Sequence, residues 1–448
     1  MHLYKKVHFI GIGGISMSAL AKILISNGVE VSGSDITPTP ITEELASMGA
    51  KICIPHCYDC IEDPDIIVYT SAIKDDNPEM CAAKDKGITL VERAAMVGNI
   101  MRSCSTAVAV AGTHGKTTTT SMMAYTMISA NLDPTVMVGG ELDILKGNLR
   151  IAKSGYMVTE ACEYCRNFLQ FAPRIGMILN IEADHLDYYR DLDDVIDAFS
   201  SFSALIPEDG VLVINGDDEN CLKAAKSAKC PVIKVGIKNG DYKAENIAYD
   251  KFGYPSFDIT KDGNKIMSLT LNVVGEHNIY NSLCAVAATL AMTDDAKAIK
   301  AGLEKFTGTK RRFEKKGEAN GILIVDDYAH HPTEIKATLS AVSKIQSGKI
   351  WCVFQPHTYT RTKTLFDDFA TALADAENLV IADIYAAREK DTGLVHAKDL
   401  ADAIDGAVYI SGFENIAEYF TQNAKAGDII LTMGAGDIFK VGEILLNK

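Results

Sequence analysis

The chain has 448 residues, of which 47% are hydrophobic and 23% are charged, and 59 acidic against 44 basic side chains give a formal net charge of −15. This length predicts two to four domains at about 100–200 residues each, and the ordinary composition excludes disordered, collagen-like and fibrous classes. The acidic balance argues against general nucleic-acid binding, because a phosphate backbone needs a basic surface. No apolar run reaches the ~18 residues of a membrane-spanning helix, so we expect no membrane partner.

Strands alternate with helices along the whole chain, a pattern that predicts an α/β protein with parallel sheets covered by helices. The first unit is expected to hold a helix at 17–26 and strands at 7–10, 30–33, 51–55, 66–69 and 89–91. The second unit is expected to hold helices at 93–102, 119–127 and 278–292 and strands at 106–111, 156–159, 175–180 and 211–215.

Residues 242–274 have alternating patterns and Gly or Asn turns, which predict a small antiparallel sheet within the second unit. The third unit begins after Gly308 with a cluster of basic residues that includes Lys310 and Arg312. Its expected strands are at 322–326, 350–354, 379–382 and 429–433.

The 11 cysteines are odd in number and scattered, which is typical of a reducing cytosol rather than a disulfide framework. Cys53, Cys57 and Cys60 have the CxxxCxxC spacing of some iron–sulfur sites, and Cys162 and Cys165 form a CxxC pair. The first set lacks a fourth ligand, and the second lacks the further pair that a zinc site needs. We interpret both sets as ordinary thiols of a cytoplasmic protein.

A glycine-rich turn joins the first strand to the first helix, and it contains Gly11, Gly13, Gly14 and Ser16. Such glycines let the backbone approach a pyrophosphate at a helix N-terminus. Asp35 ends the next strand, where an acid accepts hydrogen bonds from a ribose. Because Ser16 stands at the third-glycine position, the dinucleotide fingerprint is incomplete. NAD, a nucleotide sugar and a purely structural turn therefore remain as alternatives.

A second glycine loop lies between an apolar strand and a helix, and it reads Gly112-Thr113-His114-Gly115-Lys116-Thr117-Thr118. Backbone N–H groups of such a loop hold phosphates, Lys116 reaches the γ-phosphate, and the Thr117 hydroxyl binds Mg²⁺. The general GxxxxGK[ST] pattern fails, because it needs a glycine at Val110. The context still predicts an ATP site.

Polar residues follow several other expected strands. Glu160 ends one strand and His185 follows another, so both are expected at the sheet edge that carries the phosphate loop, where they could hold Mg²⁺. Helix capping by neighbouring aspartates is the alternative. The segments DDYAHHPTE (326–334) and QPHTYTRT (355–362) also follow strand ends. Their histidines, acids and arginine predict a binding edge rather than a transition-metal site, because a spaced set such as HExxH is missing.

In order along residues 8–437, the chain reads HFIGIGGISMSALA, TSAI, AGTHGKTTTT, NIEADHLD, GEHNIYNSLCA, KRRFE, DDYAHHPTE, FQPHTYTRTK, DIYAARE and GAGD. With these motifs the chain resembles the Mur ligase family, in the branch that acts on UDP-N-acetylmuramate. The resemblance implies a UDP-binding Rossmann-like domain (1–93), a central P-loop-type ATPase domain (94–309) and a Rossmann-like C-terminal domain (310–448). The last is expected to close over ATP and to bind the amino acid.

The resemblance also implies roles for individual residues. The UDP moiety is expected at the first glycine loop, near Asp35, His56 and Ser71. ATP is expected at the second glycine loop, with Asn278 and Asn281 at the adenine and with Arg312 and Asp327 from the third domain. The expected metal ligands are Thr117, Glu160 and His185. The incoming amino acid is expected near Tyr328, His330, His357 and Arg361, and the expected catalytic residues are Lys116, Asp327, His330 and Arg312.

Three positions depart from the family pattern. Residues 199–201 lack the lysine that several relatives use at a second Mg²⁺. Thr358 stands where relatives often have arginine, which leaves Arg361 as the main clamp for the amino-acid carboxylate. Cys162 stands where many relatives have aspartate, which makes Glu163 a further candidate ligand.

The activity implied is ATP-dependent amide-bond formation with Mg²⁺, or alternatively Mn²⁺. The lactyl carboxylate of UDP-N-acetylmuramate would attack ATP, and the resulting acyl phosphate would react with L-alanine during peptidoglycan synthesis. Addition of a tripeptide to the same sugar nucleotide, as in muropeptide recycling, is the nearest alternative. A NAD-dependent oxidoreductase and a non-catalytic nucleotide switch are more distant ones. A monomer and a homodimer are both compatible with the sequence.

Overall fold

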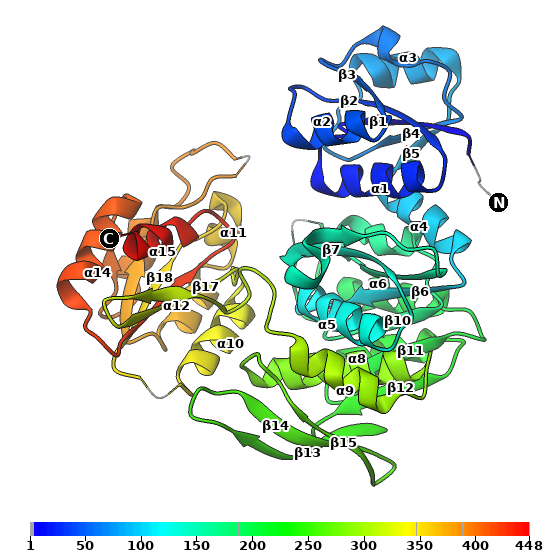
Figure 1. Cartoon of the computed structure of the whole chain (residues 1–448). Helices are drawn as coiled ribbons and strands as arrows, with labels where there is room; N and C mark the ends of the chain where they lie inside the picture. Colours follow the sequence, from blue (N-terminus) through cyan, green and yellow to red (C-terminus); the bar gives the residue numbers. More distant parts are fainter. Residues whose placement is uncertain (1–3, 187, 346, 388, 448) are drawn as a thin grey trace.

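The computed structural model describes residues 4–186, 188–345, 347–387 and 389–447. Within these residues the strands form three sheets, of five, ten and six strands, that follow one another along the chain. We call the parts built on them the N-terminal, central and C-terminal units. The N-terminal unit lies at one end of the central unit, and the C-terminal unit lies beside it (Figure 1). The predicted three-part α/β architecture is confirmed.

The N-terminal unit is a parallel sheet in the order β3-β2-β1-β4-β5. This order reverses between β1 and β4, the point at which open α/β sheets bind ligands outside the carboxyl ends of their strands. Its elements are β1 (Lys6–Ile10), α1 (Ile15–Ser26), β2 (Glu30–Ser34), α2 (Pro40–Ser47), β3 (Lys51–Cys53), the 3₁₀ turn η1 (Tyr58–Cys60), β4 (Ile66–Tyr69), α3 (Pro78–Lys86) and β5 (Leu90–Glu92).

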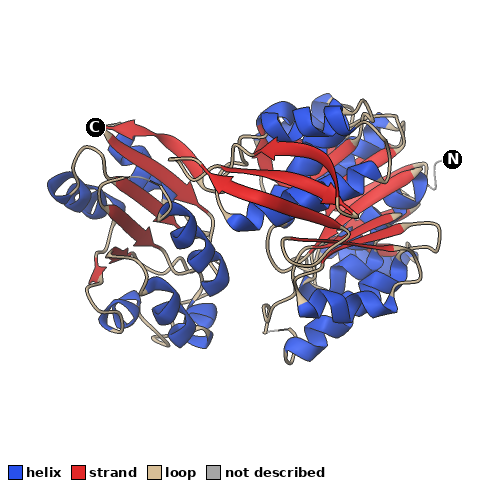
Figure 2. Ribbon diagram, turned by 90° about the horizontal axis from the view of Figure 1, so that it is seen from below, coloured by secondary structure: helices blue, strands red, loops and turns tan. Residues whose placement is uncertain are grey.

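The central unit has the strand order β15-β14-β13-β12-β11-β10-β6-β9-β7-β8, with helices on both sides of the strands (Figure 2). Its strands are β6 (Thr106–Ala111), β7 (Thr135–Leu142), β8 (Gly147–Arg150), β9 (Tyr156–Glu160), β10 (Ile175–Ile178), β11 (Val211–Asn215), β12 (Val232–Gly236), β13 (Tyr242–Tyr249), β14 (Pro255–Lys261) and β15 (Asn264–Thr270). Its helices are α4 (Arg93–Ser103), α5 (Lys116–Ser129), α6 (Leu192–Leu205), α7 (Glu219–Ala224), α8 (Glu276–Leu290) and α9 (Ala296–Lys305), with 3₁₀ turns η2 (Asp143–Leu145), η3 (Tyr164–Gln170) and η4 (Ala225–Ser227).

The segment 242–274 forms the predicted antiparallel strands, but they do not make a small sheet of their own. Its strands β13, β14 and β15 are antiparallel, but β13 also pairs in parallel with β12 and so extends the large sheet. Tyr242 and Ala244 of β13 are buried in the same apolar cluster as the central strands. Burial of this face explains why the hairpin joins the existing sheet edge instead of standing alone.

The C-terminal unit has the order β16-β17-β21-β18-β19-β20, parallel except for the edge strand β16. The basic segment after Gly308 therefore leads into a strand that the sequence analysis did not predict. Its elements are β16 (Glu314–Ala319), β17 (Ile322–Asp327), α10 (Pro332–Val342), β18 (Ile350–Phe354), α11 (Tyr359–Thr364), α12 (Phe366–Leu373), β19 (Asn378–Ile381), α13 (Ala397–Asp402), β20 (Val408–Tyr409), α14 (Phe413–Asn423), β21 (Ile429–Met433) and α15 (Phe439–Leu446).

A disulfide joins Cys53 to Cys60, so the interpretation of these two residues as ordinary thiols is wrong. The chain reverses between the end of β3 and the end of η1, and this reversal brings the two side chains together. Spacing along the sequence could not show the reversal. Among the described residues, no helix combines the length and the apolar character that crossing a bilayer requires.

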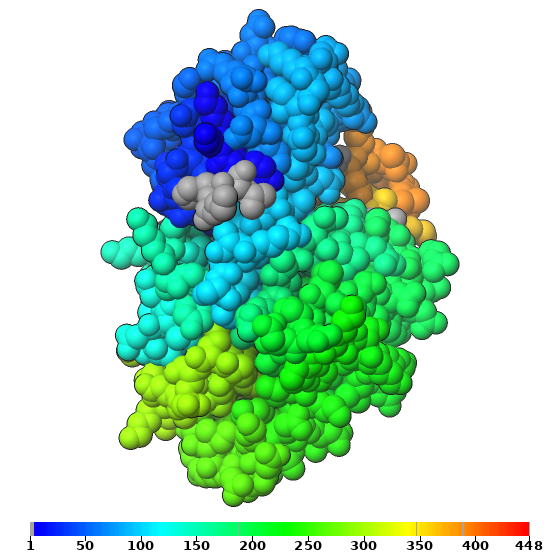
Figure 3. Space-filling model, turned by 90° about the vertical axis from the view of Figure 1, so that its right-hand side faces the viewer, coloured from blue at the N-terminus to red at the C-terminus, as the bar shows by residue number. Residues whose placement is uncertain are grey.

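Helix α4 connects the first two units through apolar packing. Its buried residues, among them Met96, Val97 and Met101, belong to one cluster that also contains Val7 of β1 and Phe199 of α6. The N-terminal unit is thereby seated directly on the central one (Figure 3). The C-terminal unit has apolar clusters of its own.

Gly98 gives a test of this packing. A Cβ at this position would lie 2.0 Å from the carbonyl oxygen of Gln170 in η3, and this backbone atom cannot swing aside. We expect Gly98→Ala to lower the unfolding free energy by about 1–3 kcal/mol, measured by chemical denaturation. The exposed change Arg102→Ala on the same helix should alter stability by no more than ~0.5 kcal/mol. Equal stability of the two variants would contradict the tight contact.

Candidate active site

The second glycine loop connects β6 to α5 at the carboxyl edge of the central sheet. Gly112 and Gly115 have φ angles of +148° and +84°, which residues with a side chain rarely adopt. A Cβ on Gly112 would also press against Leu179 at 3.0 Å. The two glycines therefore allow the turn that places the N-terminus of α5, with its unpaired N–H groups, at the loop.

Lys116 folds back over this loop. Its Nζ donates to the carbonyl oxygens of Gly112 at 2.6 Å and of Thr113 at 3.0 Å, and it lies 2.8 Å from Oε2 of Glu163. Burial alone would lower the pKa of Lys116, but the Glu163 carboxylate raises it above its ordinary value. The ammonium group is therefore charged and is held where the loop would receive a phosphate.

Glu163 lies beside two of the predicted site residues, Lys116 and His185. Its side chain is only 2% exposed, and it contacts Lys116 and lies 3.6 Å from Nε2 of His185. Burial would raise the pKa of Glu163, but Lys116 and His185 hold it below the ordinary value. The structure therefore keeps a buried, ionised carboxylate beside the phosphate loop.

The other predicted metal ligands lie around this position. Glu160 ends β9, and its Oε1 accepts a hydrogen bond from the backbone N–H of Gly139 at 2.6 Å. Thr117 lies in the first turn of α5. The carboxylates and the hydroxyl are oxygen donors of the kind that Mg²⁺ prefers, so the residues present fit this ion. The assignment of Thr117, Glu160 and His185 as ligands stays a prediction.

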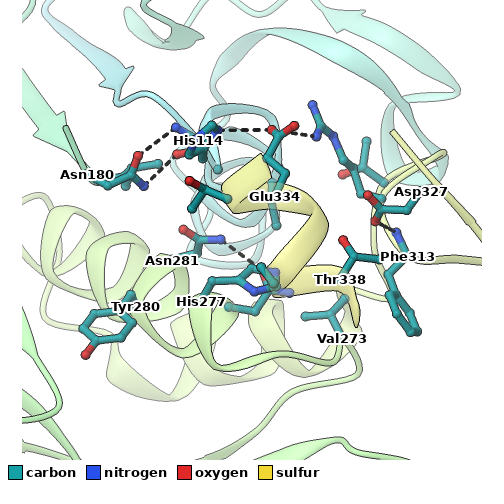
Figure 4. A pocket seen from close by; sticks show the side chains of 18 of the residues that line it. His114, Asn180, Val273, His277, Tyr280, Asn281, Phe313, Asp327, Glu334 and Thr338 are labelled. Atoms are coloured by element: carbon teal, nitrogen blue, oxygen red, sulfur yellow. Dashed lines mark hydrogen bonds and ion pairs between the residues drawn. The ribbon is translucent and has the colours of Figure 1, made fainter. Parts of the chain in front are cut away.

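A pocket lies between the central and C-terminal units, beside the phosphate loop (Figure 4). Asn278 and Asn281 of α8 line it, and Asn281 donates a hydrogen bond to Asn278 Oδ1 at 3.0 Å. His277 lines it too, and burial lowers the pKa of this residue to about 4, which keeps the ring neutral. The further lining includes His114, Gly115, Thr118, Asn180, Arg312, Asp327 and Glu334.

The two adjacent arginines of the basic segment have different positions. Arg311 pairs with Asp326 at 3.0 Å and donates to the carbonyl oxygens of Gly434 and Gly436, so it holds the C-terminal unit together. Arg312 lines the pocket, and its guanidinium lies 5.0 Å from the centre of the Tyr328 ring. Of the two, Arg312 is therefore the one placed to meet a phosphate.

His114 of the phosphate loop connects the central unit to the C-terminal unit. Its Nδ1 lies 3.2 Å from Oε1 of Glu334, near the start of α10, and its backbone N–H donates to Asn180 Oδ1 at 2.8 Å. Glu334 also lies 3.8 Å from Arg312, and Thr333 donates to Glu182 at 2.6 Å. These polar contacts fix α10 against the phosphate loop.

The same contacts set the protonation of His114. Burial would lower the pKa of His114, but Glu182 and Glu334 raise it to about 9. Burial would raise the pKa of Glu334, but His330 and His114 lower it well below its ordinary range. The pair is therefore a charged contact between the two units at neutral pH.

Asp327 and His330 differ in their suitability for proton transfer. Asp327 accepts backbone N–H groups from Phe313 at 2.7 Å and Ala329 at 2.8 Å, and burial raises its pKa to about 6. His330 lies 3.0 Å through Nδ1 from the Tyr328 carbonyl oxygen, and burial lowers its pKa to about 4. At neutral pH the histidine is uncharged, whereas the aspartate titrates close to neutrality.

A second pocket lies next to the first, again between the central and C-terminal units. His185, His357 and Arg361 line it together, although they are distant in the sequence. The ring of His357 is 6.1 Å from that of His330. Glu389 accepts backbone N–H groups at the start of α11 and thereby orients the helix that carries Arg361. Of the four residues predicted to bind the amino acid, the structure places His357 and Arg361 in this pocket, with His330 beside His357.

In the N-terminal unit the glycine loop lies at the carboxyl edge of the sheet. Gly11 has φ +80°, and the Gly13 N–H donates to Oδ2 of Asp35 at 2.8 Å. Gly14 precedes α1, and Ser16 is exposed in its first turn. Asp35 therefore lies directly against the loop with which it was predicted to act.

His56 contacts the buried carboxylate of Glu79. Its Nδ1 lies 2.7 Å from Ser34 Oγ and 2.9 Å from Oε1 of Glu79, and Oε2 of Glu79 lies 2.6 Å from Nε2 of the fully buried His8. Ser71 follows β4 and is exposed at the same sheet edge. The roles of Asp35, His56 and Ser71 toward a nucleotide stay predictions.

Sequence reasoning gave no role to several residues that shape the site. Glu334 occupies the third position of α10, where its side chain accepts the N–H groups of His330 and His331. A helix-capping pattern would have found the helix start, but not the contact with His114 across the units. Glu182, His277 and Glu79 were likewise missed, because only the fold brings their partners near.

The raised pKa of His114 predicts a pH-dependent stability. The charged pair stabilises the folded state fully below pH ~6.5 and loses this effect as the pH rises through about 9. Between pH 6.5 and 9.5 we expect the wild type to lose on the order of 2–3 kcal/mol more unfolding free energy than His114→Gln. Glu334→Gln should flatten the profile only in part, because Glu182 still raises the pKa of His114. Parallel profiles for all three proteins would contradict the pair.

Three models of Mur ligase domains match consecutive parts of the chain. The family's catalytic domain matches residues 6–104, the middle domain residues 110–289 and the glutamate ligase domain residues 311–436. The UDP-N-acetylmuramate–L-alanine ligase of Clostridium botulinum strain Langeland is 54% identical over 447 residues, which cover 99% of this chain and 98% of that protein.

Two solved structures show the same likeness. The UDP-N-acetylmuramate-alanine ligase of Thermotoga maritima has a TM-score of 0.79 at 30% identity, covering 99% of this chain and 98% of that chain. A murein peptide ligase of Psychrobacter arcticus has a TM-score of 0.70 at 27% identity over the same shares. With a relative 54% identical along nearly its whole length, the chain belongs to the Mur ligase family.

Proposed function

We propose that this chain joins L-alanine to the lactyl carboxylate of UDP-N-acetylmuramate at the expense of ATP, giving UDP-N-acetylmuramoyl-L-alanine, ADP and phosphate in peptidoglycan synthesis. One observation carries the proposal. The phosphate loop and Arg312 border one pocket, and Arg361 lines an adjoining pocket beside His185. Such an arrangement supports binding of an ATP γ-phosphate and an amino-acid carboxylate within reach of one carboxylate substrate. The names of the Clostridium and Thermotoga relatives support alanine as the acceptor.

The chemistry needs an activated carboxylate, because a free one is a poor electrophile. The lactyl carboxylate attacks the γ-phosphorus, the bond to the bridging oxygen of ADP breaks, and an acyl phosphate forms. Lys116 and Arg312 offset the negative charge that builds on the transferring group. For this, Lys116 leaves Glu163 for the phosphate, which frees a buried carboxylate beside the loop.

Thr117, Glu160 and His185 would hold Mg²⁺, and Glu163 is the further candidate. Bound there, the ion would supply positive charge to the phosphate oxygens. The protein's own part is to orient the nucleotide: Asn278 and Asn281 line its pocket, and Asn180 clamps the phosphate loop through the backbone of His114.

In the second step the alanine amine attacks the acyl carbon, and phosphate leaves from the tetrahedral intermediate. Arg361 would bind the alanine carboxylate. A pKa of about 6 makes Asp327 a better-matched proton acceptor than His330, whose pKa is about 4. The neutral His330 then orients the amine rather than removing its proton.

The proposed division of labour follows the three units, with cuts near residues 93 and 309. Residues 1–93 bind the UDP-sugar, 94–309 bind ATP, and 310–448 close over ATP and bind the amino acid. We further propose a cytoplasmic enzyme that works as a monomer or homodimer on small-molecule substrates.

An acceptor comparison tests the function. Purified chain with ATP, Mg²⁺ and UDP-N-acetylmuramate should release phosphate with L-alanine at least ~100-fold faster than with the recycling tripeptide. Preference for the tripeptide would make the chain a recycling ligase instead. Phosphate release that is as fast without an acceptor as with L-alanine would favour a non-catalytic nucleotide switch.

Lys116 gives a second test. Lys116→Ala should lower kcat/KM by at least about 10³-fold, because it removes charge from the transferring phosphate. Binding of the sugar nucleotide, measured by calorimetry, should stay within about twofold, because its crevice lies in another unit. Lys226→Ala removes the same charge from an exposed position and should keep full activity. Activity retained by Lys116→Ala would remove the central assignment.

A further inference from the structure

Three cysteines of one short segment gather in the N-terminal unit, away from the two pockets between the central and C-terminal units. Cys53 and Cys60 form the disulfide, and the Sγ of Cys57 lies 2.8 Å from that of Cys60 and 3.7 Å from that of Cys53. All three sulfur atoms lie within 4.8 Å of one another. A thiol in contact with a disulfide is placed to exchange with it, because exchange proceeds by attack of a thiolate on a disulfide sulfur.

Cys60 could form a disulfide with either Cys53 or Cys57. Cys57 contacts it more closely than it contacts Cys53, so attack on Cys60 is the shorter path. Cys60 is also the most buried of the three, at 9% exposure, whereas Cys53 and Cys57 are half-buried and within reach of a reagent from solvent. The sulfur shared by both disulfides, that of Cys60, is therefore the buried one, and those of Cys53 and Cys57 lie nearer to solvent.

The cluster is joined to the residues predicted to hold UDP. The carbonyl oxygen of Cys53 accepts the backbone N–H of Asp35 at 3.3 Å. His56 lies inside the loop that the disulfide closes, and it contacts Ser34 and Glu79. A change of pairing at Cys53 therefore acts on both Asp35 and His56.

We propose that Cys53, Cys57 and Cys60 form a thiol-oxidation site that exchanges one disulfide among three sulfurs and sets the affinity of the N-terminal crevice for the nucleotide. The coupling to nucleotide affinity rests on the proposed function, whereas the oxidation site itself does not. Disulfides in reducing compartments are mostly transient or redox-sensing, which fits a site of this kind better than a structural staple.

The oxidant is a disulfide of low molecular weight. A cysteine thiolate attacks one of its sulfurs, forming a mixed disulfide and releasing one thiolate. A second cysteine thiolate attacks the protein sulfur of the mixed disulfide, forming the intrachain bond and releasing the second thiolate. Two cysteine thiols are oxidised, one reagent disulfide is reduced to two thiols, and the cysteine protons go to the released thiolates.

Exchange within the cluster needs no further reagent. The Cys57 thiolate attacks Cys60, the Cys57–Cys60 bond forms, and Cys53 leaves as a thiolate that takes up the proton lost by Cys57. With Cys53–Cys60 paired, the end of β3 is tied to the end of η1. With Cys57–Cys60 paired, that tie is released and the loop carrying His56 is held only by noncovalent contacts.

Thiol mapping of the full chain tests the site. The three cysteines lie in one tryptic peptide, residues 52–74. After equilibration with glutathione and glutathione disulfide at varied ratios and alkylation, this peptide should lose two alkyl groups without gaining glutathione. Cys57→Ser should keep that loss through Cys53–Cys60, and Cys53→Ser through Cys57–Cys60.

Cys60→Ser removes the shared sulfur and should accumulate the mixed disulfide with glutathione instead. Cys81→Ser, which removes an exposed thiol of the same unit, is the matched control and should behave as the wild type. Alkylation of all three cysteines at every ratio would overturn the proposal. One zinc ion per chain that protects all three thiols would also overturn it, in favour of a metal site.

Calorimetry with UDP tests the coupling. The Cys53–Cys60 form should bind UDP at least about threefold more tightly than the reduced form, because the closed loop holds Asp35 and His56 in place. Cys53→Ser should show no such difference between its oxidised and reduced forms. Equal affinity of the two wild-type forms would overturn the coupling. Failure of both forms to bind UDP would instead count against the proposed function, while the thiol mapping would stand.

Discussion

Glu334 of α10, a partly buried carboxylate, links the central and C-terminal units. Glu334 contacts His114 of the phosphate loop and lies 3.8 Å from Arg312. Buried charges are costly unless they are paired, so each of these groups depends on the others. The loop that would receive ATP is thereby positioned by residues from the opposite unit. The pocket has its described shape only when the two units are together, which makes closure part of the site and not an addition to it.

The two junctions of the molecule differ in kind. Helix α4 joins the N-terminal and central units through a continuous apolar cluster, which favours a fixed relation between them. The C-terminal unit instead meets the central one through polar contacts, such as Thr333 with Glu182 and Lys310 with Glu141. Polar contacts exchange readily with water and with a nucleotide, so this junction is the one suited to opening. If the proposed closure takes place, this junction is the one that would open for substrate entry.

Much of the architecture was predictable, because parallel strands place their carboxyl ends at one edge. That rule located the phosphate loop, His185, Asp327 and Arg361 near the site without any coordinates. The alternation of strand and helix patterns along the sequence predicted the bounds of four strands correctly, namely β6, β11, β18 and β21. The rule fails where partners depend on chain reversal or on another unit: the Cys53–Cys60 disulfide, the meeting of Lys116 with Glu163 and the contact of Glu334 with His114 had no local signal. The attachment of β13 to β12 was missed for the same reason.

At the pocket beside the phosphate loop, acidic side chains of this acidic chain pair with the basic ones. Each cation that faces a predicted phosphate has an acid beside it: Lys116 has Glu163, and Arg312 and His114 share Glu334. These pairs keep the cations charged and in place while no nucleotide is bound, but they also compete with phosphate oxygens for the same donors. On the proposed function, a nucleotide would displace carboxylates as it binds, and the displaced Glu163 would carry the negative charge that suits a divalent cation. An excess of 15 acids and an affinity for polyanions are compatible, because the acids hold the cations in place until phosphate replaces them.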